Sequence, residues 1–183
     1  MTSTFRPPHP VLRFCGVIGG VAADRDRAVV ALADHWGDVI VRSDPIRFDD
    51  RGYYATTMGT DLRQELVAFD GLQDPAGLAD WKHESIDWEQ RLAGELDASV
   101  VRPINLDTGY LTEAKFVLAT TKNRSHRVYL RRDVFAEITL TYVHGRWTTH
   151  DWTYPNYFDE KVTRFCEDTR SELRRRLRHG RDA

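Results

Sequence analysis

The first half of the chain alternates short apolar runs with helically spaced apolar positions. Val11–Ile18 is an apolar run that predicts a strand, and Asp24–Trp36 has the three- and four-residue spacing of a buried helix face. Val39–Val41 predicts a second strand. A second helix is predicted from Asp74-Pro75, a cap followed by proline, to Gly94.

Two further stretches complete this half. Leu62–Phe69 fits both alternation and helical spacing, and we favour a strand because it would form a hairpin with Tyr53–Met58. Ser99–Ile104 predicts the last strand. The resulting order over residues 11–104 is strand-helix-strand-strand-helix-strand, which is typical of a ferredoxin-like βαββαβ unit.

The second half has a different pattern of apolar and polar positions. Four strand-like runs are separated by short turns: Phe116–Thr121, His126–Arg131, Val134–Val143 and Arg146–Trp152. This pattern predicts an antiparallel meander within residues 105–157. A helix should follow over about 158–178, and the proline-rich residues 1–10 should be a disordered leader. We therefore expect a single α+β domain.

Turn lengths suggest a register for the meander. A loop over residues 131–133 would place Arg127 opposite Glu137. A loop over residues 123–125 would make Lys122 face His126 at a hairpin tip.

Alternation then sorts the sheet into two faces. One should be a core face carrying Leu118, Val128, Leu130, Val134, Ala136, Ile138, Leu140 and Tyr142. The other should be polar and carry Lys115, Thr121, Arg127, Tyr129, Glu137, Thr139 and His150. The polar face is either a solvated surface, which is common in antiparallel sheets, or a ligand site. Its mixture of one arginine, one glutamate, one histidine and aromatic residues favours the ligand site.

Composition narrows the class of protein. The chain has 183 residues, 41% of them hydrophobic and 30% charged, with a net charge of −2, which argues against a protein that binds nucleic acid over its whole surface. Its two cysteines, Cys15 and Cys166, lie in apolar patterns and should be buried thiols. The N-terminus lacks an apolar signal segment and no run is long enough to span a membrane, so we expect a cytoplasmic protein that does not contact membranes.

Several motifs resemble a known family. NLDTGYL at 105–111, KFVLATTK at 115–122, SHRVYL at 125–130, AEITLTY at 136–142 and TYPNY at 153–157 are similar to the family of domain of unknown function 4416. The resemblance covers nearly the whole chain but implies no named activity. Two acidic positions of the family pattern are neutral here, at Thr57 and Asn156.

The resemblance also implies a set of polar motif residues: Lys82, Arg102, Asn105, Asp107, Tyr110, Lys115, Lys122, His126, Arg127, Tyr129, Glu137, Tyr154 and Tyr157. The set is rich in cationic side chains, which bind phosphate or carboxylate groups. We therefore expect a pocket for an anionic small molecule, such as a phosphorylated metabolite or a nucleotide.

Roles within that pocket follow from side-chain chemistry. Arg102, Lys115, Lys122 and Arg127 would bind the anion, with Glu137 orienting Arg127. His126 would be the acid or base, and Asp107 a possible second group. The remaining ligand-binding candidates are Lys82, Asn105, Tyr110, Tyr129 and Tyr154. Nothing points to a particular cofactor, and no pair of His or Cys residues has metal-ligand spacing.

The alternative is a binding module without catalytic activity. The last helix ends in an arginine-rich run, Arg170 to Arg181, which could contact RNA, although cations also complement the C-terminal end of a helix dipole. A partner could instead contact an aromatic patch of Trp147, Trp152, Tyr154 and Tyr157.

Overall fold

The computed structural model describes residues 7–49, 52 and 54–179. Three predictions therefore lie partly outside the described residues: the leader over residues 1–6, the strand at Tyr53, and the end of the arginine run at Arg181.

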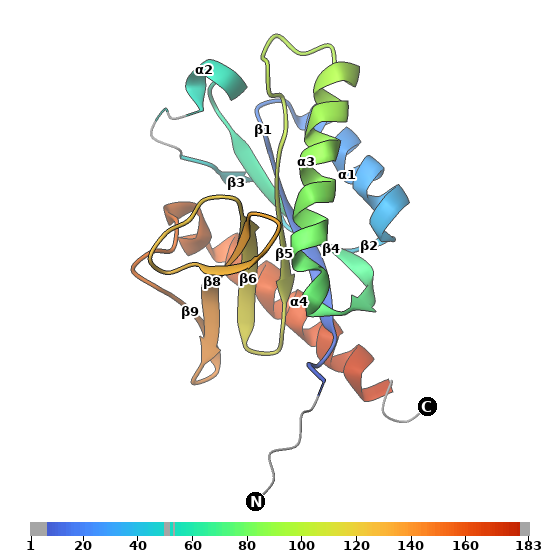
Figure 1. The fold of residues 1–183 in the computed structure, drawn as a ribbon, viewed down its shortest axis with the longest axis vertical. Coiled ribbons are helices and arrows are strands. Elements are labelled where there is room, and N and C mark those ends of the chain that lie inside the picture. The colour runs from blue at the N-terminus through green and yellow to red at the C-terminus, as the bar shows by residue number, and fades with distance from the viewer. Residues whose placement is uncertain (1–6, 50–51, 53, 180–183) are drawn as a thin grey trace, which may run out of the picture.

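The described residues form one antiparallel sheet (Figure 1). Its strands are β1 (Val11–Gly19), β2 (Val39–Arg42), β3 (Ile46–Arg47), β4 (Arg63–Gln73), β5 (Asn105–Leu111), β6 (Lys115–Thr120), β7 (Val128–Arg131), β8 (Val134–Val143) and β9 (Arg146–Thr149). They follow the order β2-β4-β1-β5-β6-β8-β7, with β3 added to β4 and β9 to β8. All the pairings are antiparallel.

Helices cover both faces of the sheet. The helical elements are α1 (Ala22–Trp36), α2 (Ala55–Met58), α3 (Leu78–Glu95) and α4 (Glu160–His179), with short 3-10 turns η1 (Pro75–Gly77) and η2 (Pro155–Phe158). α1 and α3 bury one face of the sheet, here called the α1/α3 face, and α4 buries the opposite one, the α4 face. Figure 1 shows α3 in front of the sheet and α4 passing behind it. The chain is thus an α+β protein with a large antiparallel sheet.

The strand over Leu62–Phe69 is confirmed as part of β4, but its predicted hairpin partner is wrong. Ala55–Met58 forms the short helix α2 instead. The strand predicted over Ser99–Ile104 is also wrong, because β5 begins at Asn105. The glycine of NLDTGYL is therefore not in a turn. A Cβ on Gly109 would lie 2.3 Å from the Val117 carbonyl oxygen, so the glycine permits close packing within the sheet.

The predicted meander is wrong at its first hairpin. β6 pairs with β8 and not with β7, and residues 121–127 form an exposed loop that carries the chain to the far side of β8. Lys122 and His126 consequently do not face each other as a strand pair. The register between β7 and β8 is as predicted at Val128, which pairs with Ala136, and the preceding residue, Arg127, contacts Glu137. The predicted loop over residues 131–133 is too long, because Arg131 belongs to β7 and pairs with Val134.

The predicted core face is also partly wrong. Val128 is 68% exposed, Leu130 and Ile138 are 40% exposed, and Glu137 is buried. Two structural features explain the difference. β7 is an edge strand that no helix covers. β8 also contains one extra residue, because Phe116 pairs with Leu140 whereas Val117 pairs with Ile138. Side chains before this irregularity therefore point to the opposite face from the one that strict alternation along β8 predicts.

Candidate functional site

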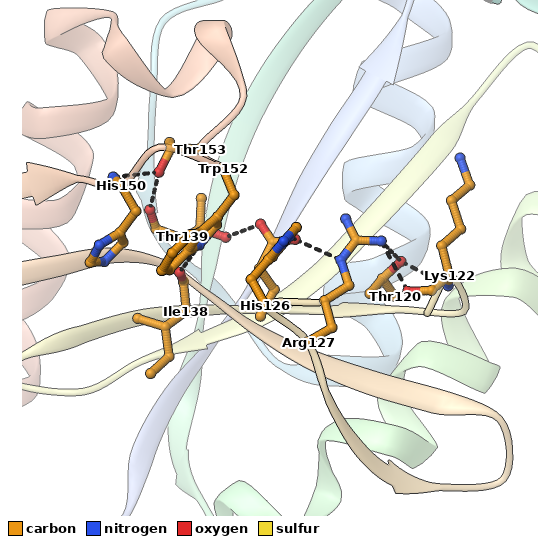
Figure 2. A network of polar contacts seen from close by, with 10 residues as sticks. Thr120, Lys122, His126, Arg127, Ile138, Thr139, His150, Trp152 and Thr153 are labelled. Atoms are coloured by element: carbon orange, nitrogen blue, oxygen red, sulfur yellow. Dashed lines mark hydrogen bonds and ion pairs between the residues drawn. The ribbon is translucent and has the colours of Figure 1, made fainter. Parts of the chain in front are cut away.

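Glu137 is the centre of a buried polar cluster on the α4 face, and Figure 2 shows its partners His126, Arg127 and Thr139. Its side chain is 3% exposed, yet its carboxylate has three partners. Arg127 donates from Nε to Oε2 at 2.8 Å, His126 Nε2 lies 3.1 Å from the same oxygen, and Thr139 donates from Oγ1 to Oε1 at 3.1 Å. These four residues are called the Glu137 cluster below. A buried carboxylate needs such compensation, because removing it from water is costly.

Arg127 is held in one orientation. Its Nη1 donates to the Lys122 carbonyl at 3.0 Å and lies 3.4 Å from the Thr120 hydroxyl, and its side chain is only 7% exposed. Within the described part of the chain, Nη2 makes no hydrogen bond to protein. One edge of a pre-oriented guanidinium is therefore available for a ligand.

A stack of three aromatic rings flanks the cluster. Trp152 lies between His126 and His150, with ring centroids 5.3 and 4.7 Å apart and rings within 9° and 12° of parallel. The Trp152 indole donates to the Ile138 carbonyl at 2.9 Å, which fixes the stack to β8. Trp152 thus contacts both imidazoles and remains 39% exposed. A surface cavity beside the stack is lined by Ser125, His126, Asp151 and Trp152.

A second buried polar group lies on the same face of the sheet. Asn156 donates to Gln64 Oε1 at 2.6 Å, and Gln64 Nε2 lies 3.3 Å from the Tyr157 hydroxyl. Burial raises the pKa of Tyr157 well above its ordinary value, and the charges of Asp107 and Glu137 add to this. Gln64 was not predicted, because it lies at the polar start of β4, between Arg63 and Glu65, where the local pattern does not mark it as buried.

Lys82, Arg102 and Asn105 lie away from the Glu137 cluster. Lys82 is buried and donates to the Leu106 carbonyl at 2.9 Å. Arg102 pairs with Glu89 at 2.7 Å and contacts Asn105. Glu89, which sequence reasoning missed, also accepts from the Leu106 amide at 2.7 Å. These contacts join α3 to β5 and give the three residues a structural role.

Four other candidates are scattered. Lys115 is exposed at the opposite end of β6 from Thr120. Tyr110 packs against the core under α1 and α3, and burial raises its pKa. Tyr129 is 56% exposed on β7, and Tyr154 is exposed just before η2. Of the predicted residues, the structure therefore brings together His126, Arg127 and Glu137, whereas Asp107 lies on β5, which β6 separates from β8.

The arginines of α4 are largely engaged with the protein itself. Arg175 and Arg176 both donate to Glu172, and Arg170 lies 3.8 Å from the Tyr142 ring centroid. The hydrogen bond from Arg175, followed by that from Arg176, lowers the pKa of Glu172 to about 2. These contacts account for much of the arginine run without an RNA partner.

The cysteines are poor nucleophiles. Burial raises the pKa of both Cys15 and Cys166, so both thiols stay protonated near neutral pH. Among the described residues, no group of three or more His, Cys, Asp or Glu side chains is placed to hold a metal ion. No helix in the same part of the chain is long and apolar enough to cross a membrane.

Comparison with known proteins gives a family but no activity. The model of the family described as "Domain of unknown function (DUF4416)" matches residues 10–173. No curated protein matches the chain.

Proposed function

The chain belongs to the DUF4416 family, and from that premise we propose that it binds a small anionic molecule, such as a phosphorylated metabolite or a nucleotide, at the Glu137 cluster. The observation that carries the proposal is Arg127, a buried guanidinium fixed by Glu137 with one amino group free of protein partners. An arginine fixed in this way loses little conformational entropy when it binds phosphate or carboxylate.

The charge around the cluster supports an anion. The exposed loop before β7 carries Lys122, Arg124 and Arg127, and no acidic residue occurs between Lys122 and Arg132. Of these residues, Arg127 forms an ion pair with Glu137. The loop is thus a local cationic surface on a chain whose net charge is −2, and such a surface attracts anionic ligands.

His126 adds a group suited to proton transfer. One ring nitrogen faces Glu137, and Trp152 stacks on the imidazole. A carboxylate that orients an imidazole in this way is a common arrangement in acid–base sites. We assign His126 to ligand contact.

Binding of inorganic pyrophosphate tests the proposal. Pyrophosphate should raise the melting temperature of the protein, because a ligand that binds only the folded state stabilises it. Arg127→Lys keeps the charge but loses the planar fork, and should weaken binding in calorimetry by about tenfold, the loss of one charge-assisted hydrogen bond.

Arg131→Lys is the matched control, since Arg131 lies on β7, the strand that follows Arg127, and pairs with Asp80, away from the cluster. The proposal fails if pyrophosphate does not stabilise the parent protein, or if both variants bind it equally well.

For the fold, we propose that β1, α1, β2, β4, α3 and β5 form a ferredoxin-like unit with β3 and α2 inserted. Support comes from the antiparallel order β2-β4-β1-β5 and from the position of α1 and α3 on one face. An experimental structure with another strand order would contradict this assignment.

A further inference from the structure

Asp107 lies on the same face of the sheet as the Glu137 cluster. Gly109 pairs with Leu118, which pairs in turn with Glu137, so these three positions share a face. Asp107 precedes Gly109 by two residues, and Thr120 follows Leu118 by two. Because side chains alternate along a strand, Asp107 and Thr120 also point to the α4 face from neighbouring strands.

The two strands separate at this point. β5 pairs with β6 only from Gly109 to Leu111. Closer to its start, the outward amide and carbonyl of Leu106 are bonded by Glu89 and Lys82 of α3 instead of by β6. Asp107 therefore projects from the part of β5 that β6 does not pair with.

The Asp107 carboxylate differs from the other carboxylates of the sheet. Glu65 and Glu137 are both tied to arginines. Asp107 is partly buried, and within the described chain its carboxylate has neither a hydrogen bond nor an ion pair. Its charge nevertheless reaches Tyr157, whose pKa it helps to raise. The Asp107 carboxylate is therefore a hydrogen-bond acceptor without a donor, and its charge acts on the buried Tyr157 hydroxyl.

Arg127 lies on the other side of Thr120. Its Nη1 is 3.4 Å from the Thr120 hydroxyl. Arg127 and the Asp107 carboxylate thus lie on one face of the sheet, with β6 between β5 and β8. A ligand that contacts both side chains would present an anionic group to Arg127 and a hydrogen-bond donor to Asp107.

We propose that Asp107 is the second recognition point of the anion site, accepting a hydrogen bond from a hydroxyl or amino group of the ligand that Arg127 binds. The ligand class is then a phosphorylated or carboxylated polyol or amine, and not a simple anion. This inference rests on the proposed anion binding at the Glu137 cluster.

A pair of probes with the same charged group tests the inference. Methyl phosphate carries only the anion, and glycerol 3-phosphate carries the same group with hydroxyl donors. The parent protein should bind glycerol 3-phosphate about tenfold more tightly in calorimetry, as expected for one hydrogen bond to a charged acceptor. Asp107→Asn should remove most of this preference. It should leave methyl phosphate binding unchanged or slightly tighter, because a nearby negative charge is lost.

Asp80→Asn is the charge-matched control, because Asp80 pairs with Arg131 and Arg132, away from the cluster, and it should preserve the preference. Equal affinity of the parent protein for the two probes would overturn the inference about Asp107 and leave the anion site intact. Failure of both probes to bind would overturn the anion site itself. The comparison in the parent protein decides the inference even if Asp107→Asn does not fold.

Discussion

At the scale of single residues, Glu137 and Gly109 show what a sequence pattern can and cannot predict. The contact between Arg127 and Glu137 could be predicted because a short turn sets the register of β7 against β8. The burial of Glu137 could not, because it depends on the extra residue in β8. The close packing at Gly109 could not be predicted either, since Phe14 and Val117 come from other strands and the local pattern does not indicate their approach.

Gly109→Ala should destabilise the protein strongly. The new methyl group would lie 2.4 Å from the Phe14 ring and 2.3 Å from the Val117 carbonyl oxygen, so the sheet would have to move. We expect a loss of about 3 kcal/mol in the free energy of unfolding, measured by chemical denaturation, at the upper end of overpacking costs.

Gly94→Ala is the opposite case and serves as its control. Gly94 lies inside α3 with nothing within 4 Å of the added Cβ, so alanine should stabilise the protein by about 0.5–1 kcal/mol. Equal effects of the two substitutions would show that the close packing around Gly109 is not as described.

At the scale of elements, side chains of α3 bond the backbone of β5 where β5 is no longer paired with β6. Lys82 and Glu89 bond the outward carbonyl and amide of Leu106, which a neighbouring strand would otherwise satisfy. The sequence marked Lys82 as a ligand-binding candidate through the family resemblance, and helical periodicity contains no signal for a lysine that bonds a strand. A polar residue that the family pattern picks out can therefore have a structural role.

Glu89→Ala tests this role. The substitution leaves the Leu106 amide and Arg102 without their acceptor, and should cost about 2–3 kcal/mol in the free energy of unfolding. Glu95→Ala on the same helix removes only an exposed contact with Arg27 and should cost less than about 1 kcal/mol. Similar losses for both variants, measured by urea denaturation, would argue against a strand-completing role for α3.

At the scale of the whole molecule, the α+β class and the terminal helix α4 were predictable, because long periodic segments give the clearest signals. The strand order of the second half was not. Short turns suggested that strands adjacent in sequence also pair in space. Instead, the loop over residues 121–127 crosses β8, so that β6 and β7 pair with opposite edges of β8. That crossing carries His126 and Arg127 over Glu137, so the event that assembles the candidate site is the one that local patterns miss.

The aromatic stack offers the most direct test of the Glu137 cluster as an anion site. The protein has five tryptophans, whose indole N–H groups give separate proton–nitrogen NMR signals. Trp152 stacks on His126, whereas Trp36 bonds Glu84 beneath α1 and α3 on the opposite face. In a titration with inorganic pyrophosphate at constant ionic strength, the Trp152 signal should shift saturably while that of Trp36 stays in place. A titration that leaves Trp152 unmoved, or moves both signals equally, would contradict anion binding at the Glu137 cluster.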